Sequence, residues 1–379
     1  MLRLLTAGES HGKTLLAVLD GFPAGLKIDT APIDRELQRR QGGYGRGGRQ
    51  KLETDTVEIL TGIWQGVTLG GPITLAVANS DYKLERLKEL ERPRPGHGDL
   101  TGAIKYLGSI RGILERASAR ETAVRVAAGA LTQQLLGEFG MTVFGYVTQL
   151  EQIATTPRQG SLDELRALRD ASPMYTLDPD TDPQIVARVD AATQQGDTLG
   201  GIVEVQVHNP PFGLGSHAQW DRKLDGLLAQ AVMSIQAIKG VEIGLGFEAS
   251  RRPGSKVHDE IAYDPAAADG SKLGYVRKTN NAGGLEAGMT NGQPIVVRAA
   301  MKPISTLRRP LESINLKSKQ AETAAYERSD VCALAACSVI VESVVALTVA
   351  AAMIEKFGGD SLAEMHAQFE TFQKLARQR

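Results

Sequence analysis

Two histidines lie in loops whose other residues suit the binding of anions. His11 lies in GESHGK, 8–13, and His97 in RPGHGD, 94–99, where glycines permit positive φ and, in the second loop, prolines fix the backbone. A single histidine is more often structural than catalytic. Beside arginine and a bound anion, however, an imidazole can be held protonated and act as a general acid. We therefore predict that both histidines are proton donors at an anion site.

Arginine is concentrated in two stretches of the chain. The guanidinium group binds carboxylate and phosphate in a planar, bidentate way that lysine does not match. Arg46 and Arg94, held in loops rich in glycine or proline, are predicted to bind an anion, whereas a solvated helix face explains Arg35 and Arg39 equally well. The first stretch has a single acid, Glu36. The two sets are Arg35, Arg39, Arg40, Arg46 and Arg49, and Arg92, Arg94, Arg111, Arg116, Arg120 and Arg125.

Asp330 follows these loops in ERSD, 327–330, at the expected start of a helix. An aspartate in that place commonly caps the helix N-terminus. The residue pattern alone leaves capping and catalysis open as its role.

Two nucleotide-binding patterns occur in unsuitable surroundings. AGESHGKT, 7–14, resembles a phosphate loop, but Gly21 and Pro23 follow too soon for the helix that such a loop requires. GYGRGG, 43–48, matches the dinucleotide pattern but follows a helix instead of a strand. A P-loop-like nucleotide-binding protein using AGESHGKT therefore stays as the alternative function. An RNA-binding module at 42–49 is a third hypothesis, with Tyr44 as its one aromatic residue.

The elements that must position these loops alternate between short strands and helices. No linker divides them, so we predict a single large α+β domain over 1–379, with the more polar stretch 151–197 as a peripheral excursion. Ser118 and Glu121 form a capping-box pattern before a buried helix. The expected strands lie within 1–20, at 55–63, 72–78 and 201–208, and the expected helices at 32–40, 119–139, 224–238, 330–356 and 361–377.

Composition excludes several classes of protein. The chain has 379 residues with 43 Lys+Arg against 44 Asp+Glu, a balance that argues against coating nucleic acid or a membrane surface. Cys332 and Cys337 form neither a disulfide framework nor a metal site, so no metal is predicted. The longest apolar run, 343–354, is too short to span a bilayer, and no signal peptide is visible, so we expect a cytoplasmic protein.

Eight motifs, in family order along the chain, resemble those of the chorismate synthase family. The similarity covers essentially the whole chain and is least distinctive in 151–197. The motifs are GESHG at 8–12, RRQGGYGRGGR at 39–49, RPGHGD at 94–99, ERASARET at 115–122, SIQAIKGVEIGLGF at 234–247, TNGQPI at 290–295, KPIST at 302–306 and ERSD at 327–330.

This resemblance implies a lyase of the shikimate pathway of aromatic amino acid biosynthesis. Such an enzyme converts 5-enolpyruvylshikimate 3-phosphate to chorismate and phosphate by a 1,4-anti elimination, with reduced FMN and no net redox change. It also implies a β/α/α/β sandwich with internal duplication and a homotetramer. The source of reduced flavin stays open between NADPH and a separate flavin reductase.

The resemblance also implies roles for single residues. His11 is the candidate donor to the leaving phosphate, His97 protonates or stabilises the reduced flavin, and Asp330 assists at its N5. Flavin contacts carry over to Arg116, Ala117, Ser118, Gln236, Ala237, Ala287, Lys302, Pro303, Ile304, Ser305, Thr306 and Arg328. Substrate contacts carry over to Arg40, Arg46, Arg49, Arg94 and Arg120, and NADPH contacts to Arg40 and Arg46.

The chain departs from many relatives at three of these positions. It has Ala117, Gln236 and Ala287 where they have serine, asparagine and glycine. Contacts through backbone atoms would tolerate these changes, but Ala287 would be strained if its loop needs positive φ.

Overall fold

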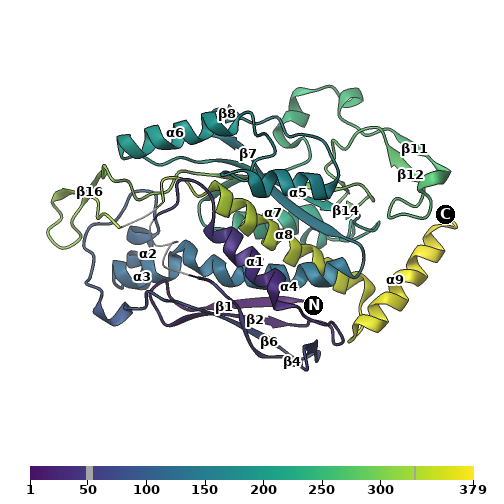
Figure 1. Cartoon of the computed structure of the whole chain (residues 1–379), viewed down its shortest axis with the longest axis horizontal. Coiled ribbons are helices and arrows are strands. Elements are labelled where there is room, and N and C mark those ends of the chain that lie inside the picture. The colour runs from purple at the N-terminus through teal and green to yellow at the C-terminus, as the bar shows by residue number, and fades with distance from the viewer. Residues whose placement is uncertain (48–53, 328–329) are drawn as a thin grey trace.

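Alternating burial along the N-terminal strands produces a sheet with one covered face. In β2 (Thr14–Asp20), Leu15, Ala17 and Leu19 are fully buried while the residues between them are not. The computed structural model, which describes residues 1–47, 54–327 and 330–379, pairs this strand in an antiparallel sheet ordered β1-β2-β6-β3 (Figure 1). The other strands of this sheet are β1 (Arg3–Ala7), β6 (Ile73–Ala78) and β3 (Glu58–Thr61).

A second antiparallel sheet has the order β10-β15-β9-β7-β8. In β15 (Ile295–Met301), Ile295, Val297 and Ala299 are fully buried, so one face of this sheet is also covered by other parts of the chain. Its other strands are β10 (Ile238–Ile243), β9 (Gly201–His208), β7 (Thr142–Leu150) and β8 (Ile153–Ala154).

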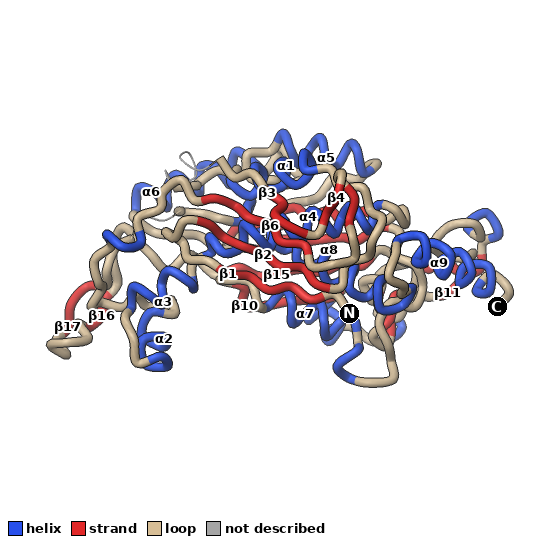
Figure 2. Tube along the Cα trace, turned by 90° about the horizontal axis from the view of Figure 1, so that it is seen from below, coloured by secondary structure: helices blue, strands red, loops and turns tan. Residues whose placement is uncertain are grey.

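Apolar helices fill the space between the two sheets. α4 (Thr122–Gly137) packs on β2 and β6, α8 (Leu334–Phe357) packs on β7 and β9, and the two helices pack on each other. α1 (Thr30–Gln41) and α7 (Leu224–Met233) complete this layer. Figure 2 shows the first sheet in front of the helices. The arrangement confirms the predicted α+β class and the β/α/α/β sandwich.

α4 and α8 approach closely at Gly129. A Cβ atom on Gly129 would lie 2.4 Å from Cβ and 2.5 Å from Cα of Ser343, so only glycine fits there. α8 is long and apolar enough to cross a membrane, although the apolar run seen in the sequence is shorter. Of the apolar 18-residue stretch of this helix, 89% is buried inside the molecule, as in a core helix.

Three local predictions need correction. Ser118 caps the single 3-10 turn Ala119–Glu121 by accepting a bond from Arg120 N, and the capping box is absent there because the Glu121 carboxylate accepts bonds from Thr6 and Arg125 instead. The helix expected at 224–238 ends at Met233, because Ala237 has a φ of +68° and Ile238 starts β10.

The stretch 151–197 is also more firmly attached than an excursion. Its helices are α5 (Leu162–Ala171) and α6 (Asp182–Gln195). Leucines of α5 pack on Phe144 and Tyr146, while Ile185 and Val189 of α6 are fully buried in the main core.

The remaining helices and four two-stranded sheets complete the described fold. The helices are α2 (Asp99–Tyr106), α3 (Ile110–Ala117) and α9 (Leu362–Ala376), and the short strand pairs are β4 (Ile63–Trp64) with β5 (Val67–Thr68), β11 (Ile261–Tyr263) with β12 (Tyr275–Arg277), β13 (Leu285–Glu286) with β14 (Met289–Thr290), and β16 (Glu312–Ile314) with β17 (Ala321–Thr323).

Candidate active site

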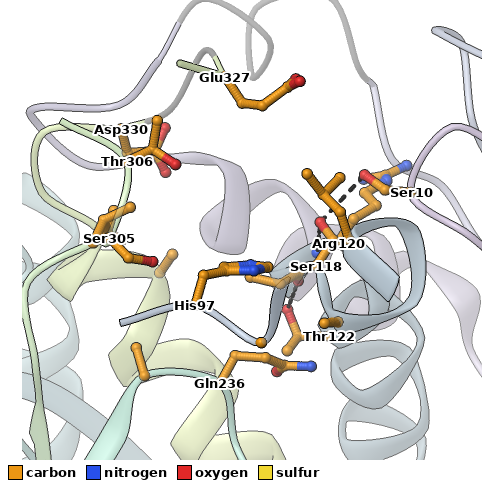
Figure 3. Close-up of a pocket in the computed structure, with 18 of the residues that line it drawn as sticks. Ser10, His97, Ser118, Arg120, Thr122, Gln236, Ser305, Thr306, Glu327 and Asp330 are labelled. Carbon is orange, nitrogen blue, oxygen red and sulfur yellow. Dashed lines mark hydrogen bonds between the residues drawn. The ribbon is translucent and has the colours of Figure 1, made fainter. Parts of the chain in front are cut away.

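A cavity of about 760 Å³ is lined by loops from distant parts of the chain. His97 lies near the middle of the view in Figure 3, and the labelled side chains surround the cavity. The lining comes from the β1–β2 loop, the loop after α1, the loop before α2, the junction of α3 and α4, the turn before β10, the segment after β15 and the start of α8. The AGESHGKT segment joins two antiparallel strands, so the helix that a phosphate loop requires is absent from it.

His11 lies in the β1–β2 loop and is held by Glu115 of α3. The His11 Nδ1 atom is 3.0 Å from both carboxylate oxygens of Glu115, and the His11 backbone N–H donates to Oε2 at 2.8 Å. The Glu115 side chain is only 1% exposed. Burial alone would raise the pKa of this carboxyl, but hydrogen bonds from His11 and the charge of Arg111 bring it below its ordinary value.

His97 is held by a second buried carboxylate. The His97 Nδ1 atom is 2.5 Å from Oδ1 of Asp99, which is fully buried. Arg94 donates to the same carboxylate through Nε at 2.8 Å and Nη2 at 3.0 Å, and Nη1 donates to Thr306. Burial opposes ionisation of Asp99, but the bonds from His97 and Arg94 hold its pKa well below the usual range. An ionised carboxylate only accepts, so His97 Nδ1 carries the proton of this bond.

Arg40 and Arg120 share one buried carboxylate. Nη1 of each is paired with Oδ2 of Asp55, at 3.4 Å for Arg40 and 2.6 Å for Arg120. Arg40 also donates to Thr122 Oγ1 and to the carbonyl of Ala119. Burial lowers the pKa of Arg40 to about 9, partly countered by Asp55, so this guanidinium is still charged at neutral pH. The two arginines bring more positive charge to the cavity than their shared partner cancels.

The Asp330 side chain contacts the loop after α1. Its Oδ2 atom is 3.3 Å from Arg46 Nη1, and its Oδ1 atom accepts a bond of 2.5 Å from Gly47 N. α8 starts only at Leu334, with Ala333 at its N-cap. Capping of this helix is therefore not the role of Asp330.

The cavity contains most of the residues predicted for the site. The residues on its lining are His11, His97, Asp330, Arg40, Arg46, Arg94, Arg120, Ala117, Ser118, Gln236, Ala237, Lys302, Pro303, Ile304, Ser305 and Thr306. Arg49 and Arg328 lie outside the described residues.

Two predicted flavin contacts lie away from the lining. Arg116 donates to the carbonyls of Thr6 and Gly8 instead of reaching into the cavity. Ala287 lies in the β13–β14 turn, where its φ of +51° is the strained conformation anticipated for it.

Arg94 lines the cavity, but the donors described above bind Asp99 and Thr306.

Sequence reasoning missed several charged groups of the site. Glu115 and Asp99 were present in the motifs, but no role was assigned to them. Arg111 lies one helical turn before Glu115 on α3, a spacing that could have indicated their pairing. Lys83 and Lys239 also line the cavity and had no recognisable signal in the sequence.

The lining fits ligands that combine an anionic group with a flat ring. Three buried side-chain atoms on it, Arg46 Nε, Arg111 Nη1 and Gln236 Oε1, have no hydrogen-bond partner among the described residues. Such atoms are costly to bury unless a ligand satisfies them. An apolar group on the same lining suits a ring system. Its members are Leu87, Leu114, Ile235, Ile238, Met301, Ala333, Ala336 and Ile340.

The cysteines take no part in a disulfide. Cys332 and Cys337 are free and buried, and burial raises their pKa to about 11 and about 12. Neither thiol is therefore ionised near neutral pH.

Comparisons with known proteins agree on one family. The family model described as chorismate synthase matches residues 2–354. The chorismate synthase of Geobacter metallireducens is 54% identical, with 98% of each chain covered, and that of Geobacter sulfurreducens is 52% identical, with 100% of each chain covered. A solved structure titled "Crystal Structure of Chorismate Synthase" superposes with a TM-score of 0.82 at 41% identity, over 100% of this chain and 99% of that one.

Proposed function

Because the chain belongs to the chorismate synthase family, we propose that its cavity binds 5-enolpyruvylshikimate 3-phosphate together with reduced FMN. The activity is that of a chorismate synthase, a carbon–oxygen lyase of aromatic amino acid biosynthesis that eliminates phosphate from this substrate. One observation carries the proposed site: two histidines, each bound to a buried carboxylate, line the same cavity as five arginines, Arg40, Arg46, Arg94, Arg111 and Arg120.

The arginines suit the charges of the substrate. It carries one phosphate and two carboxylates, and a guanidinium can bind either group through two donors. Arg46 and Arg111 support this role because each has a buried nitrogen without a hydrogen-bond partner among the described residues. Positive charge near the leaving phosphate oxygens lowers the barrier for breaking the carbon–oxygen bond.

His11 is proposed to donate a proton to the leaving phosphate. In the elimination, C6 gives up its proton, for which reduced FMN would be the acceptor, and the C6–H electron pair forms a new ring double bond. The existing ring double bond shifts by one position, and the carbon–oxygen electrons leave with the phosphate. A proton from His11 neutralises one oxygen of that leaving group. His97, on the other loop, places a second imidazole against the cavity, where it can face an anionic ring system.

Reduced FMN, when bound, supplies electron density to the substrate without net redox change. The residues proposed to hold it are Ala117, Ser118, Gln236, Ala237 and the segment 302–306, all of which line the cavity. Asp330 and Arg46, joined by their ion pair, lie on the same lining.

The decisive experiment is a phosphate-release assay under anaerobic conditions. With reduced FMN and 5-enolpyruvylshikimate 3-phosphate, the purified chain is expected to release phosphate in equal amount to chorismate, followed by its absorbance. Omitting the flavin tests the cofactor separately. Absence of phosphate release with flavin and substrate present would overturn the proposal.

The two histidines are tested by single substitutions. We expect His11→Ala and His97→Ala each to lower turnover by about 10-fold or more, since general acids contribute about 10²-fold to 10⁴-fold. Circular dichroism should show that both variants are folded. Wild-type turnover in either variant would remove that histidine from the mechanism.

The remaining assignments concern the source of the reduced flavin and the oligomeric state of the protein. We propose a cytoplasmic homotetramer that receives reduced flavin either with NADPH, through Arg40 and Arg46, or from a separate flavin reductase. NADPH oxidation by the pure chain with FMN, and no other protein, would favour the first source. Light scattering should give the mass of four chains.

A further inference from the structure

Glu115 holds the His11 loop through three hydrogen bonds. Its carboxylate accepts from the ring Nδ1 atom of His11 at 3.0 Å and from the backbone N–H of the same residue at 2.8 Å. Its backbone carbonyl accepts from Ser10 N at 2.9 Å. The Glu115 side chain is 1% exposed and that of His11 13% exposed, so the histidine and not the carboxylate is the one offered to the cavity.

From this geometry we infer that Glu115 is a positioning residue of the reaction: it fixes the His11 ring and places a negative charge beside the imidazolium that donates from Nε2. The inference rests on the proposed role of His11 as the acid. With Nδ1 bound to Glu115, Nε2 is the nitrogen from which His11 can donate to a ligand in the cavity.

The ionised state of Glu115 determines which tautomer His11 adopts after donation. An ionised carboxylate has no proton to give, so Nδ1 must carry the hydrogen of their bond. When the Nε2–H bond breaks and the proton passes to a phosphate oxygen, the neutral ring keeps its Nδ1 proton and holds a lone pair on Nε2. Glu115 stays ionised throughout, and the next turnover begins when Nε2 takes up a proton.

Other charged groups near His11 do not replace this carboxylate. Arg111 Nη1 is 3.6 Å from Oε1 of Glu115, and Arg111 Nη2 is paired with Glu327 at 2.9 Å. Asp81 and Lys83 come from the segment after β6 and line the same cavity. Glu9 and Lys13 lie in the loop of His11 itself. Glu115 places both of its carboxylate oxygens 3.0 Å from one ring atom of His11, Nδ1.

The kinetic test is Glu115→Gln, which keeps the shape of the side chain but removes its charge. We expect kcat for phosphate release to fall by about 10-fold or more while KM changes by less than about 3-fold. The high-pH limb of the pH–rate profile, where activity is lost, should move to lower pH, since the imidazolium has lost its counter-charge. Glu115→Asp, which keeps the charge, should restore the position of this limb even where kcat stays low.

A matched control separates this effect from the loss of any buried carboxylate. Glu342 of α8 is 2% exposed and accepts a bond from Gly145 N, but it lies outside the cavity lining. Glu342→Gln should reduce stability without moving the high-pH limb. The inference is contradicted if the high-pH limb of the pH–rate profile stays at the wild-type pH in Glu115→Gln, or if it moves equally in Glu342→Gln.

A second readout needs neither flavin nor turnover. Diethyl pyrocarbonate modifies only the neutral imidazole, and peptide mass spectrometry resolves His11 from the other histidines. At about pH 6, His11 in the Glu115→Gln protein should react about 3-fold or more faster than in the wild type, because less of it is protonated. His97 should react equally in both proteins.

The outcomes distinguish this inference from the proposed function. A faster His11 reaction in Glu115→Gln, in a chain that releases no phosphate, would leave the positioning intact and overturn the function. An unchanged reaction rate in an active enzyme would overturn the positioning alone. Should Glu115→Gln fail to fold, Glu115→Asp decides: a wild-type reaction profile for His11 supports the inference, and a shift to faster reaction overturns it.

Discussion

Asp99 is the carboxylate on which the His97 loop depends. It accepts bonds from the backbone N–H and Nε of Arg94 and from the ring of His97, and it is fully buried. Because these bonds hold its pKa below the usual range, they stabilise the fold above the unfolded-state pKa near 4 and lose that effect as the pH falls below it.

We expect Asp99→Asn to lower the free energy of unfolding by about 3 kcal/mol at neutral pH, the scale for breaking a buried ion pair. The difference from the wild type should shrink as the pH falls below about 4, because the carboxyl of the unfolded chain then takes up a proton while that of the native state stays ionised. It should vanish only at a still lower pH, where the native carboxyl is protonated as well. Urea unfolding at neutral and acidic pH measures both quantities. A difference that is constant with pH would show that the charge of Asp99 is not what stabilises the loop.

Single residues of the site were predicted from the sequence unevenly. His11, His97 and Arg46 could be identified because a glycine-rich loop can be recognised from a few neighbouring residues in the sequence. The partners of His11 and Arg46 could not, because Glu115 lies 104 positions from His11 and Asp330 lies 283 positions from Gly47. Asp99, the partner of His97, lies two positions away but was given no role. For Arg94 the loop context predicted ligand binding, and this stays a prediction: the residue lines the cavity, and its described donors bind Asp99 and Thr306.

At the scale of elements, the contact of α4 with α8 is the tightest constraint on the helix layer. Gly129 faces Ser343 so closely that a methyl group would overlap both its Cβ and its Cα. Neither helix can move away without separating from the sheet on which it packs, because α4 rests on β2 and β6 and α8 on β7 and β9.

We expect Gly129→Ala to destabilise the protein by about 1–3 kcal/mol, the usual cost of overpacking a core. Gly137→Ala, in the same helix, is the matched control, since nothing lies within 4 Å of its Cβ position. It should leave stability unchanged or raise it by about 0.5–1 kcal/mol, because alanine favours the helix. Chemical unfolding of the two variants compares them directly, and equal effects would contradict the packing argument.

Elements with strong local patterns were predicted well. β9 occupies the expected 201–208, and α1 extends only slightly beyond the predicted 32–40. The end of α7 was missed because the sequence gives no sign that Ala237, a residue that normally avoids positive φ, would adopt it. The tertiary pairing of β10 with β15 overrides the helical spacing there.

For the molecule as a whole, near-neutral net charge conceals a cationic interior surface. The chain carries a formal charge of −1, while arginines and lysines from several loops line one cavity. An anion bound there should stabilise the folded state by mass action, since the cavity does not exist in the unfolded chain.

We expect inorganic phosphate to raise the thermal unfolding midpoint of the ligand-free protein. At a concentration about 100 times its Kd, bound phosphate should stabilise the folded state by about 2.7 kcal/mol. Sodium chloride at equal ionic strength is the control for general screening. Arg46→Ala should weaken the phosphate effect, whereas Arg158→Ala, a surface residue paired with exposed Asp180, should not. Equal stabilisation by both salts would indicate no specific anion site.

The place of α8 in the sandwich has a consequence for how the chain is made. This helix lies at the centre of the molecule, yet only α9 follows it along the chain. Both sheets and α4 leave the ribosome before the helix that separates them is synthesised. α4 can cover the first sheet, but the apolar inner face of the second sheet and the face of α4 that packs on α8 have no permanent cover until then, and such long-range closure is slow. Interruption of translation before residue 334 would therefore leave a chain with an uncovered second sheet, a natural substrate for chaperones and proteases.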